Sequence, residues 1–133
     1  MWETHREDVA FLVVYIREAH AIDSVIPLGG AEDANLGGGQ NPLIEDPVTF
    51  EERRNVAELC MTKLALEPIP AVVDDMDDTA NRAFAAWPER LYLIGQDGRV
   101  AYGSGPGPGG FLPEDLGVAI EEELQRLGAT VSQ

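Results

Sequence analysis

The fold of this chain depends on the stretch Phe11-Leu-Val-Val-Tyr-Ile-Arg-Glu-Ala-His20. Its first six residues are apolar or aromatic without polar alternation, which is the pattern of a β-strand covered on both faces. Ionisable side chains then follow directly after the carboxyl end of that strand. In open α/β sheets this edge is where ligands and chemistry collect. The stretch therefore predicts a buried strand over residues 11–16, with Glu18 and His20 as a candidate site at its exit.

Length and composition indicate one globular domain. The chain has 133 residues, of which 44% are hydrophobic, and it carries 24 acidic against 9 basic side chains for a net charge of −15. Because phosphate groups are bound by clustered Lys and Arg, this charge balance argues against nucleic acid and anionic membranes as partners. The sequence has no apolar run of bilayer length and no visible targeting signal, so a cytoplasmic location is expected.

Metal and disulfide sites are not expected. The single cysteine, Cys60, excludes an intrachain disulfide and a thiolate zinc site. Four aspartates follow a predicted strand, but their spacing lacks the glycine and the distal glutamate of an EF-hand loop. Capping of the next helix already accounts for these carboxylates, which are Asp74, Asp75, Asp77 and Asp78.

Local signals give the remaining elements. Thr49-Phe50-Glu51-Glu52 matches a helix capping box, and Val56, Cys60 and Leu64 then follow on one apolar stripe. Cys60 is therefore interpreted as a core-filling thiol. In the first half of the chain the sequence predicts the end of a helix over residues 1–9, the strand over 11–16, a long loop over 21–48 and the helix from Thr49. In the second half it predicts a strand over 71–73, a short helix over 78–86, and a hairpin of residues 90–95 and 99–103 around Asp97-Gly98. A last helix is predicted from Pro113 to Gly128, with Leu116, Ile120, Leu124 and Leu127 on one face.

This order, βαβ followed by ββα, is the skeleton of thioredoxin-like domains. The predicted class is α/β with a thioredoxin-like fold: a central mixed sheet, a terminal antiparallel hairpin and flanking helices. Residues 1–133 are expected to form a single domain with residues 21–48 as a long loop or insertion. The first strand and the turn with the redox residue are expected to lie before Met1, so the chain is expected to be incomplete at its N-terminus.

Three blocks of sequence resemble the iodothyronine deiodinases and their bacterial deiodinase-like relatives. They are residues 11–20, residues 73–92, and residues 97–102 together with Gly105-Pro-Gly-Pro108 and the helix from Pro113. The resemblance implies a thiol or selenol oxidoreductase that carries out reductive dehalogenation of an aromatic ring or reduction of a peroxide or disulfide. It implies no bound cofactor, a small halogenated aromatic or a peroxide as substrate, and an external thiol as electron donor.

The resemblance also assigns roles to individual residues. It implies that His20 donates a proton or binds a phenol oxygen, with Glu18 setting its charge state. Tyr15, Trp87, Pro88 and Arg90 become candidate substrate-binding residues, with Pro88 near the cis-proline position of thioredoxin-like domains. Arg90 is also a candidate ion-pair partner for Glu18 or another acid.

The chain departs from the family pattern at three places. No residue matches the family's selenocysteine or the cysteine that replaces it; only Asp23 of the usual segment after the histidine is retained; and Pro106 stands where vertebrate enzymes carry an arginine. The chain by itself is therefore expected to be inactive, and an in-frame UGA codon upstream is one hypothesis for its start. The alternative is a non-catalytic thioredoxin-like domain that binds a partner, or a second copy of itself, through an exposed sheet edge.

Overall fold

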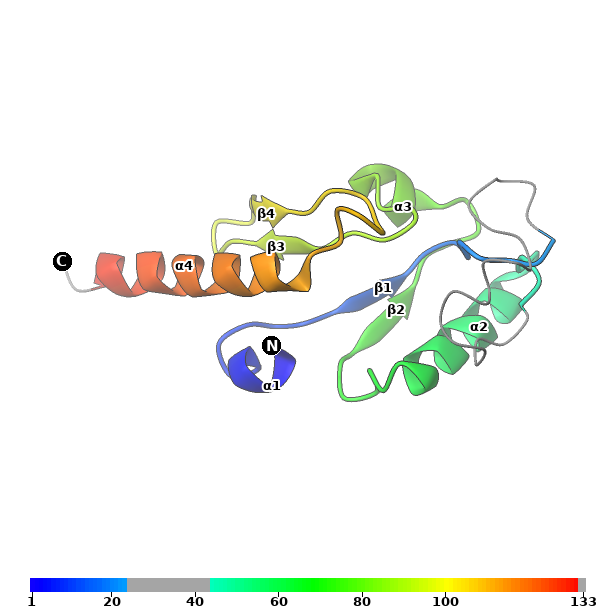
Figure 1. Ribbon diagram of the computed structural model, residues 1–133, viewed down its shortest axis with the longest axis horizontal. Helices are drawn as coiled ribbons and strands as arrows, with labels where there is room; N and C mark the ends of the chain where they lie inside the picture. Colours follow the sequence, from blue (N-terminus) through cyan, green and yellow to red (C-terminus); the bar gives the residue numbers. More distant parts are fainter. Residues whose placement is uncertain (24–43, 132–133) are drawn as a thin grey trace. The chain divides into compact units, whose positions relative to one another are not determined.

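The structure is a computed structural model that describes residues 1–23 and 44–131, with side chains to residue 128. Its elements in chain order are α1 (Trp2–His5), β1 (Val13–Tyr15), α2 (Phe50–Lys63), β2 (Ala71–Val73), α3 (Thr79–Phe84), β3 (Tyr92–Ile94), β4 (Val100–Gly103) and α4 (Pro113–Val131) (Figure 1). The chain divides into two compact units, which we call the terminal unit (Met1–Phe11 with Ala86–Gln133) and the middle unit (Leu12–Ala85). Both combine short helices and strands, so the predicted α/β class is confirmed.

The middle unit is built on a parallel pair of strands. The strands β1 and β2 lie side by side, with α2 along β2 (Figure 1). Their register pairs Val13 with Ala71, Val14 with Val72, and Tyr15 with Val73.

One face of this strand pair is exposed. Tyr15 interacts with the side chains of Arg53 and Cys60 on α2, so its face of β1 is the one that the helix covers. On the opposite face Val14 is 41% exposed and its cross-strand neighbour Val72 is 48% exposed. Within the middle unit the strand is thus covered on one face, and it is three residues long rather than the predicted six. The apolar run cannot reveal this, because side chains of a strand alternate between two faces whatever covers them.

Helix α2 begins as predicted. The Thr49 hydroxyl accepts a hydrogen bond from the Glu52 amide, and the Glu52 carboxylate accepts from the amides of Val48 and Thr49, so the capping box is confirmed. The predicted apolar stripe is wrong at Leu64, which is 61% exposed because the helix ends at Lys63 and Leu64 is its C-cap.

The buried face of α2 instead carries Arg53 and Ala57. One terminal nitrogen of Arg53 donates to the carbonyls of Asp74 and Asp75, at 3.3 and 2.6 Å, and to the Asp78 carboxylate at 2.9 Å. The guanidinium thus ties α2 to the segment that leads from β2 into α3.

Asp74 prepares the start of α3. Its buried carboxylate accepts hydrogen bonds from the amides of Asp75, Ala80 and Asn81 at 2.8–3.0 Å. The predicted capping role of this aspartate is confirmed. The helix is shorter than the predicted residues 78–86, because Asp78 and Ala85 both adopt left-handed backbone angles at its two ends.

The terminal unit consists of a hairpin packed on a helix. The strands β3 and β4 are antiparallel around the predicted Asp97-Gly98 turn, where Gly98 has φ of 77°. Leu93 of β3 packs with Leu116 and Ile120 of α4 to form the buried core.

Helix α4 continues past its predicted end. Its interior includes Gly128, and the helix runs to Val131. Glycine lowers helix propensity by only about 1 kcal/mol, which a long helix tolerates, so a glycine alone does not end it. In the described part of the chain, no helix combines the length and the apolar character needed to cross a membrane.

The ends of the predicted long loop lie together. The amide of Ile22 donates to the carbonyl of Ile44 at 2.9 Å, and Asp23 accepts from the amide of Asp46 at 2.7 Å. The part of the loop over residues 24–43 lies outside the described residues. These two hydrogen bonds connect the segment that follows β1 with the segment that leads into α2.

Candidate functional site

The candidate site in the middle unit is the turn that follows β1. Glu18 lies at its centre: one carboxylate oxygen accepts a hydrogen bond from the Tyr15 hydroxyl at 2.7 Å, and the other accepts from the amides of Ala19 and His20 at 3.0 and 2.9 Å. Glu18 therefore fixes the backbone of the turn to the side chain of the strand that precedes it. A carboxylate acting on two adjacent amides is a local hydrogen-bonding device that stabilises a tight turn.

The hydrogen bond to Glu18 also affects the pKa of Tyr15. Burial, followed by the hydrogen bond to Glu18 and its negative charge, raises the pKa of the Tyr15 hydroxyl above its ordinary value. A phenol that donates to a carboxylate is stabilised in its neutral form. Tyr15 is thus held as a hydrogen-bond donor at the base of the turn.

His20 is the exposed member of this turn. Glu18 reaches it through the His20 backbone amide, and the hydrogen bonds of the Glu18 carboxylate go to that amide, the Ala19 amide and the Tyr15 hydroxyl. The contact between Glu18 and His20 is therefore made through the backbone amide of His20. The chemical roles of Glu18 and His20 stay predictions.

The turn is anchored on both sides. Ala21 is fully buried, and Arg17 forms an ion pair with Asp46 at 3.2 Å. Arg17 and Asp46 adjoin the turn, and the motif alone did not reveal their contact, because Asp46 lies 29 residues further along the chain. The signal that could have found them is the retained Asp23, whose carboxylate accepts from the Asp46 amide.

Cys60 lies near this site but is not activated. The thiol is half-buried, and burial, followed by the negative charge of Glu18, raises its pKa. Because the thiolate is the reactive form, a raised pKa lowers nucleophilicity near neutral pH. This agrees with the interpretation of Cys60 as a packing residue.

The other predicted site residues lie in the terminal unit. Trp87, Pro88 and Arg90 are half-buried, and the Trp87–Pro88 peptide bond is cis, as expected for Pro88. The Arg90 side chain has a buried Nε without a hydrogen-bond partner among the described residues. Because these residues belong to a different unit from Glu18, an Arg90–Glu18 pair and the substrate-binding roles stay predictions.

A glycine- and proline-rich loop lies against this segment. The Ser104 hydroxyl accepts from the amide of Leu91 at 3.0 Å and donates to the carbonyl of Gly105 at 2.8 Å. The Gly107 amide donates to the carbonyl of Glu89 at 3.1 Å. Side-chain and backbone bonds thus hold the loop against residues 89–91.

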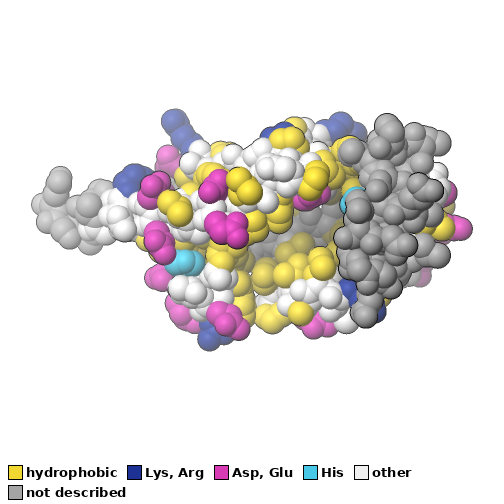
Figure 2. Space-filling model, in the orientation of Figure 1, with side chains coloured by type: hydrophobic (Ala, Val, Ile, Leu, Met, Phe, Trp, Pro, Cys, Tyr) yellow, Lys and Arg dark blue, Asp and Glu magenta, His cyan; other side chains and the backbone are white. Residues whose placement is uncertain are grey.

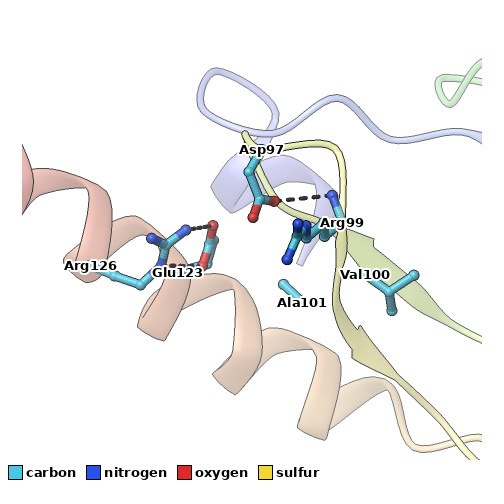
Figure 3. A pocket seen from close by; sticks show the side chains of 6 residues that line it. All are labelled: Asp97, Arg99, Val100, Ala101, Glu123 and Arg126. Carbon is cyan, nitrogen blue, oxygen red and sulfur yellow. Dashed lines mark hydrogen bonds and ion pairs between the residues drawn. The ribbon is translucent and has the colours of Figure 1, made fainter.

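A small charged recess lies between the hairpin turn and α4 (Figure 3). It has a volume of about 300 Å³, and Asp97, Arg99, Glu123 and Arg126 surround it. Arg126 binds the Glu123 carboxylate, with an Nε–O distance of 2.8 Å, and this contact lowers the pKa of Glu123. This recess is not predictable from local sequence, because its residues come from separate elements. Glu123 and Arg126 form an ion pair, Asp97 accepts a hydrogen bond from the Arg99 backbone amide at 3.0 Å, and none of the predicted catalytic groups lines the recess.

The described residues do not hold a metal centre. Among residues 1–23 and 44–131, no three His, Cys, Asp or Glu side chains lie close enough together to share an ion. The side chains that His20, Glu18 and Tyr15 bring to the described site are suited to proton transfer and hydrogen bonding.

Comparison with known proteins gives the family of the chain. Residues 1–124 match the sequence model of the family described as Iodothyronine deiodinase. The chain is 35% identical over 116 residues to a thyroxine 5-deiodinase of Sparus aurata, covering 86% of this chain and 39% of that protein. It is 33% identical over 130 residues to a thyroxine 5-deiodinase of Gallus gallus, covering 95% of this chain and 45% of that protein.

A third relative is a type I iodothyronine deiodinase of Xenopus laevis, which is 32% identical over 114 residues, 85% of this chain and 39% of that protein. The chain thus spans less than half the length of these curated relatives. The family match nevertheless covers nearly the whole of this chain and includes the β1 strand, the Glu18 turn and the hairpin. The chain therefore belongs to the iodothyronine deiodinase family.

Proposed function

We propose that this chain is part of a thiol- or selenol-dependent oxidoreductase that removes halogen from an aromatic ring, and that its two units belong to one thioredoxin-like domain. The observation that supports this most directly is the Glu18 turn, in which a carboxylate fixes the amide of an exposed histidine at the carboxyl end of a parallel strand. Ligands in α/β proteins gather at such strand ends. Membership of the deiodinase family supports the proposed reaction class.

The proposed reaction is reductive. An aryl iodide and two thiols give the arene, a disulfide and hydrogen iodide: the carbon–iodine bond breaks, the ring carbon takes a proton, and the thiols supply two electrons. The attacking selenol or thiol comes from sequence outside residues 1–133, since Cys60 does not match the family's nucleophile. His20 provides the proton or binds the phenol oxygen.

In this proposal Glu18 is a positioning residue. Its carboxylate holds the His20 amide and the Tyr15 hydroxyl, so the imidazole extends from a fixed backbone. Trp87, Pro88 and Arg90 are proposed to contribute the wall that receives the aromatic ring, with no bound cofactor. A small external thiol, as found in the reducing cytoplasm, donates the electrons.

The second candidate is a non-catalytic thioredoxin-like domain that binds a partner. One observation favours it: the single thiol of this chain is half-buried and has a raised pKa. A chain whose one cysteine is poorly nucleophilic cannot carry out the redox step with its own residues.

The test is a comparison of two substrates with one protein. The product of the complete reading frame that contains this chain is incubated with dithiothreitol and either an iodophenol or hydrogen peroxide. Thiol-dependent release of iodide is the expected result. Peroxide consumption without iodide release would assign the protein to peroxide reduction, and the absence of both reactions would support the non-catalytic alternative.

A further inference from the structure

A groove lies along the outer edge of β2, within the middle unit. It has a volume of about 780 Å³ and runs between α2 and the segment that leads into β2. Apolar side chains form most of its walls, including Phe50, Ala57 and Met61 from α2 and Ile69 and Val73 from the other side. Phe50 is 45% exposed there. This groove takes no part in the turn around Glu18.

The backbone hydrogen bonds show which groups of β2 face the groove. The Val13 amide donates to the Pro70 carbonyl at 2.9 Å, and the Asp74 amide donates to the Tyr15 carbonyl at 2.8 Å. In a parallel pair, alternate residues of a strand direct both their N–H and C=O groups to the same neighbour.

Residues 70, 72 and 74 therefore bond to β1, and the amides and carbonyls of Ala71 and Val73 point to the opposite edge. None of these four groups has a hydrogen-bond partner in the structure that covers residues 1–23 and 44–131. An open edge of this kind accepts an additional strand.

We infer that this groove is a docking site for an extended segment of a partner protein, which pairs with Ala71 and Val73 and places alternate apolar side chains against α2. Main-chain bonds supply part of the affinity in this mode, and the side-chain groove supplies selectivity. The occupant follows the alternating pattern of a strand, since only every second side chain faces the helix.

Charge indicates that the partner segment is basic. The groove lining includes Glu58 and Glu67, while its one basic side chain, Arg54, already lies 4.0 Å from the Glu58 carboxylate. The chain as a whole has a net charge of −15. Complementary charge accelerates encounter and disfavours acidic partners.

The same features disfavour a second copy of this chain as the occupant. A second copy brings its own charge of −15 to a groove that already contains Glu58 and Glu67. A basic segment does not meet this charge repulsion, and the short edge limits any strand that pairs here to a few backbone hydrogen bonds.

The test uses a fluorescent peptide, Lys-Val-Thr-Val-Thr-Val-Lys, whose binding to the protein is followed by fluorescence anisotropy. Two control peptides carry N-methyl groups, one on the valine amides and the other on the threonine amides. Strand addition needs the amides of only one of these sets, so one methylated peptide is expected to bind roughly tenfold more weakly and the other to bind like the parent. Equal binding of both methylated peptides would overturn strand pairing.

A pair of charge variants tests the position of the site. Glu67→Lys is expected to weaken binding roughly threefold to tenfold, since it replaces an attractive charge at the groove with a repulsive one. Glu121→Lys makes the same change in net charge on the exposed surface of α4 and is expected to leave binding unchanged.

Two results would contradict the inference. Equal effects of Glu67→Lys and Glu121→Lys would mean that net charge, and not this groove, attracts the peptide. A dimer detected by sedimentation that excludes the peptide would assign the groove to a second copy of the chain. Circular dichroism of both variants confirms that each is folded as the parent chain is.

Discussion

At the scale of single residues, buried polar groups organise the middle unit. Arg53 and Asp74 are both buried, and each satisfies several backbone groups at the junction of β2 and α3. Glu18 has the same function at the exit of β1. Because an unpaired buried polar group costs roughly 1–3 kcal/mol, each of these side chains specifies one arrangement of the turn around it.

Asp74 gives a stability prediction at this scale. Replacing Asp74 with Ala leaves three amides without their acceptor, and it should lower the free energy of unfolding by about 2–4 kcal/mol. Urea unfolding followed by circular dichroism measures this value. Asp8→Ala, at an exposed position, is the control and should have little effect.

The same carboxyl group predicts a pH dependence. Burial opposes its ionisation, but the hydrogen bonds from Asn81, Ala80 and Asp75 and the charge of Arg53 outweigh it, so the pKa of Asp74 is lowered in the folded state. The stabilisation is thus fully present above the unfolded pKa of about 3.9 and is lost as pH falls through the folded value. Asp74→Asn should therefore lose less stability than the parent chain below about pH 4. Parallel stability curves for the two proteins would contradict this account.

At the scale of elements, the glycine-rich loop between β4 and α4 is closely packed. A Cβ atom on Gly110 would lie 2.6 Å from backbone carbon atoms of Gly105 and 2.7 Å from the carbonyl oxygen of Pro106. Backbone atoms cannot move aside as a flexible side chain can, so this position requires glycine for close approach.

A matched pair of substitutions tests this requirement. Gly110→Ala should destabilise the protein by about 1–3 kcal/mol, because the added methyl group overlaps backbone. Gly117→Ala in α4 adds the same group where nothing lies within 4 Å, and it should stabilise the helix by up to about 1 kcal/mol. Urea midpoints of the two variants provide the comparison, and a neutral Gly110→Ala would show that the loop can open at little cost.

The elements also show what local sequence can predict. The capping box at Thr49 and the turn at Gly98 were predictable, because each depends on residues within a few positions of one another. The burial of Arg53 was not predictable, since its partners at Asp74, Asp75 and Asp78 are brought to it only by tertiary packing.

In the candidate site, too, local contacts were predictable from the sequence and tertiary contacts were not. The pairing of Glu18 with the His20 amide involves residues two positions apart, and the motif revealed the pair. The motif did not reveal that the contact goes through the backbone, nor that Arg17 and Asp46 close the turn, because these depend on side-chain direction and on the far end of a long loop. The charged recess at Glu123 was not predictable either, because the hairpin turn and α4 that form it are separate in the sequence.

At the scale of the whole molecule, charge and family membership are the main constraints. Acidic side chains are spread over the surface in view, with Lys and Arg between them (Figure 2). The net charge of −15 favours neutral or cationic partners and disfavours anionic polymers. The match over residues 1–124 shows the family, on which the proposed reaction class rests, and no composition or periodicity could have identified that family.

The proposed function can be tested at one histidine, His20. If His20 supplies a proton or binds the phenol oxygen during dehalogenation, its removal lowers the rate while the fold is retained, because its side chain is exposed. General acid catalysis by a positioned side chain typically contributes about 100-fold to 10,000-fold. The chain offers a matched control, since its only other histidine is His5.

The most direct measurement is therefore thiol-dependent iodide release by the product of the complete reading frame, compared among the parent protein, His20→Ala and His5→Ala. We expect His20→Ala to be slower by about 100-fold or more and His5→Ala to remain close to the parent rate. An undiminished rate for His20→Ala, with the variant folded, would contradict the assignment of this turn to the active site.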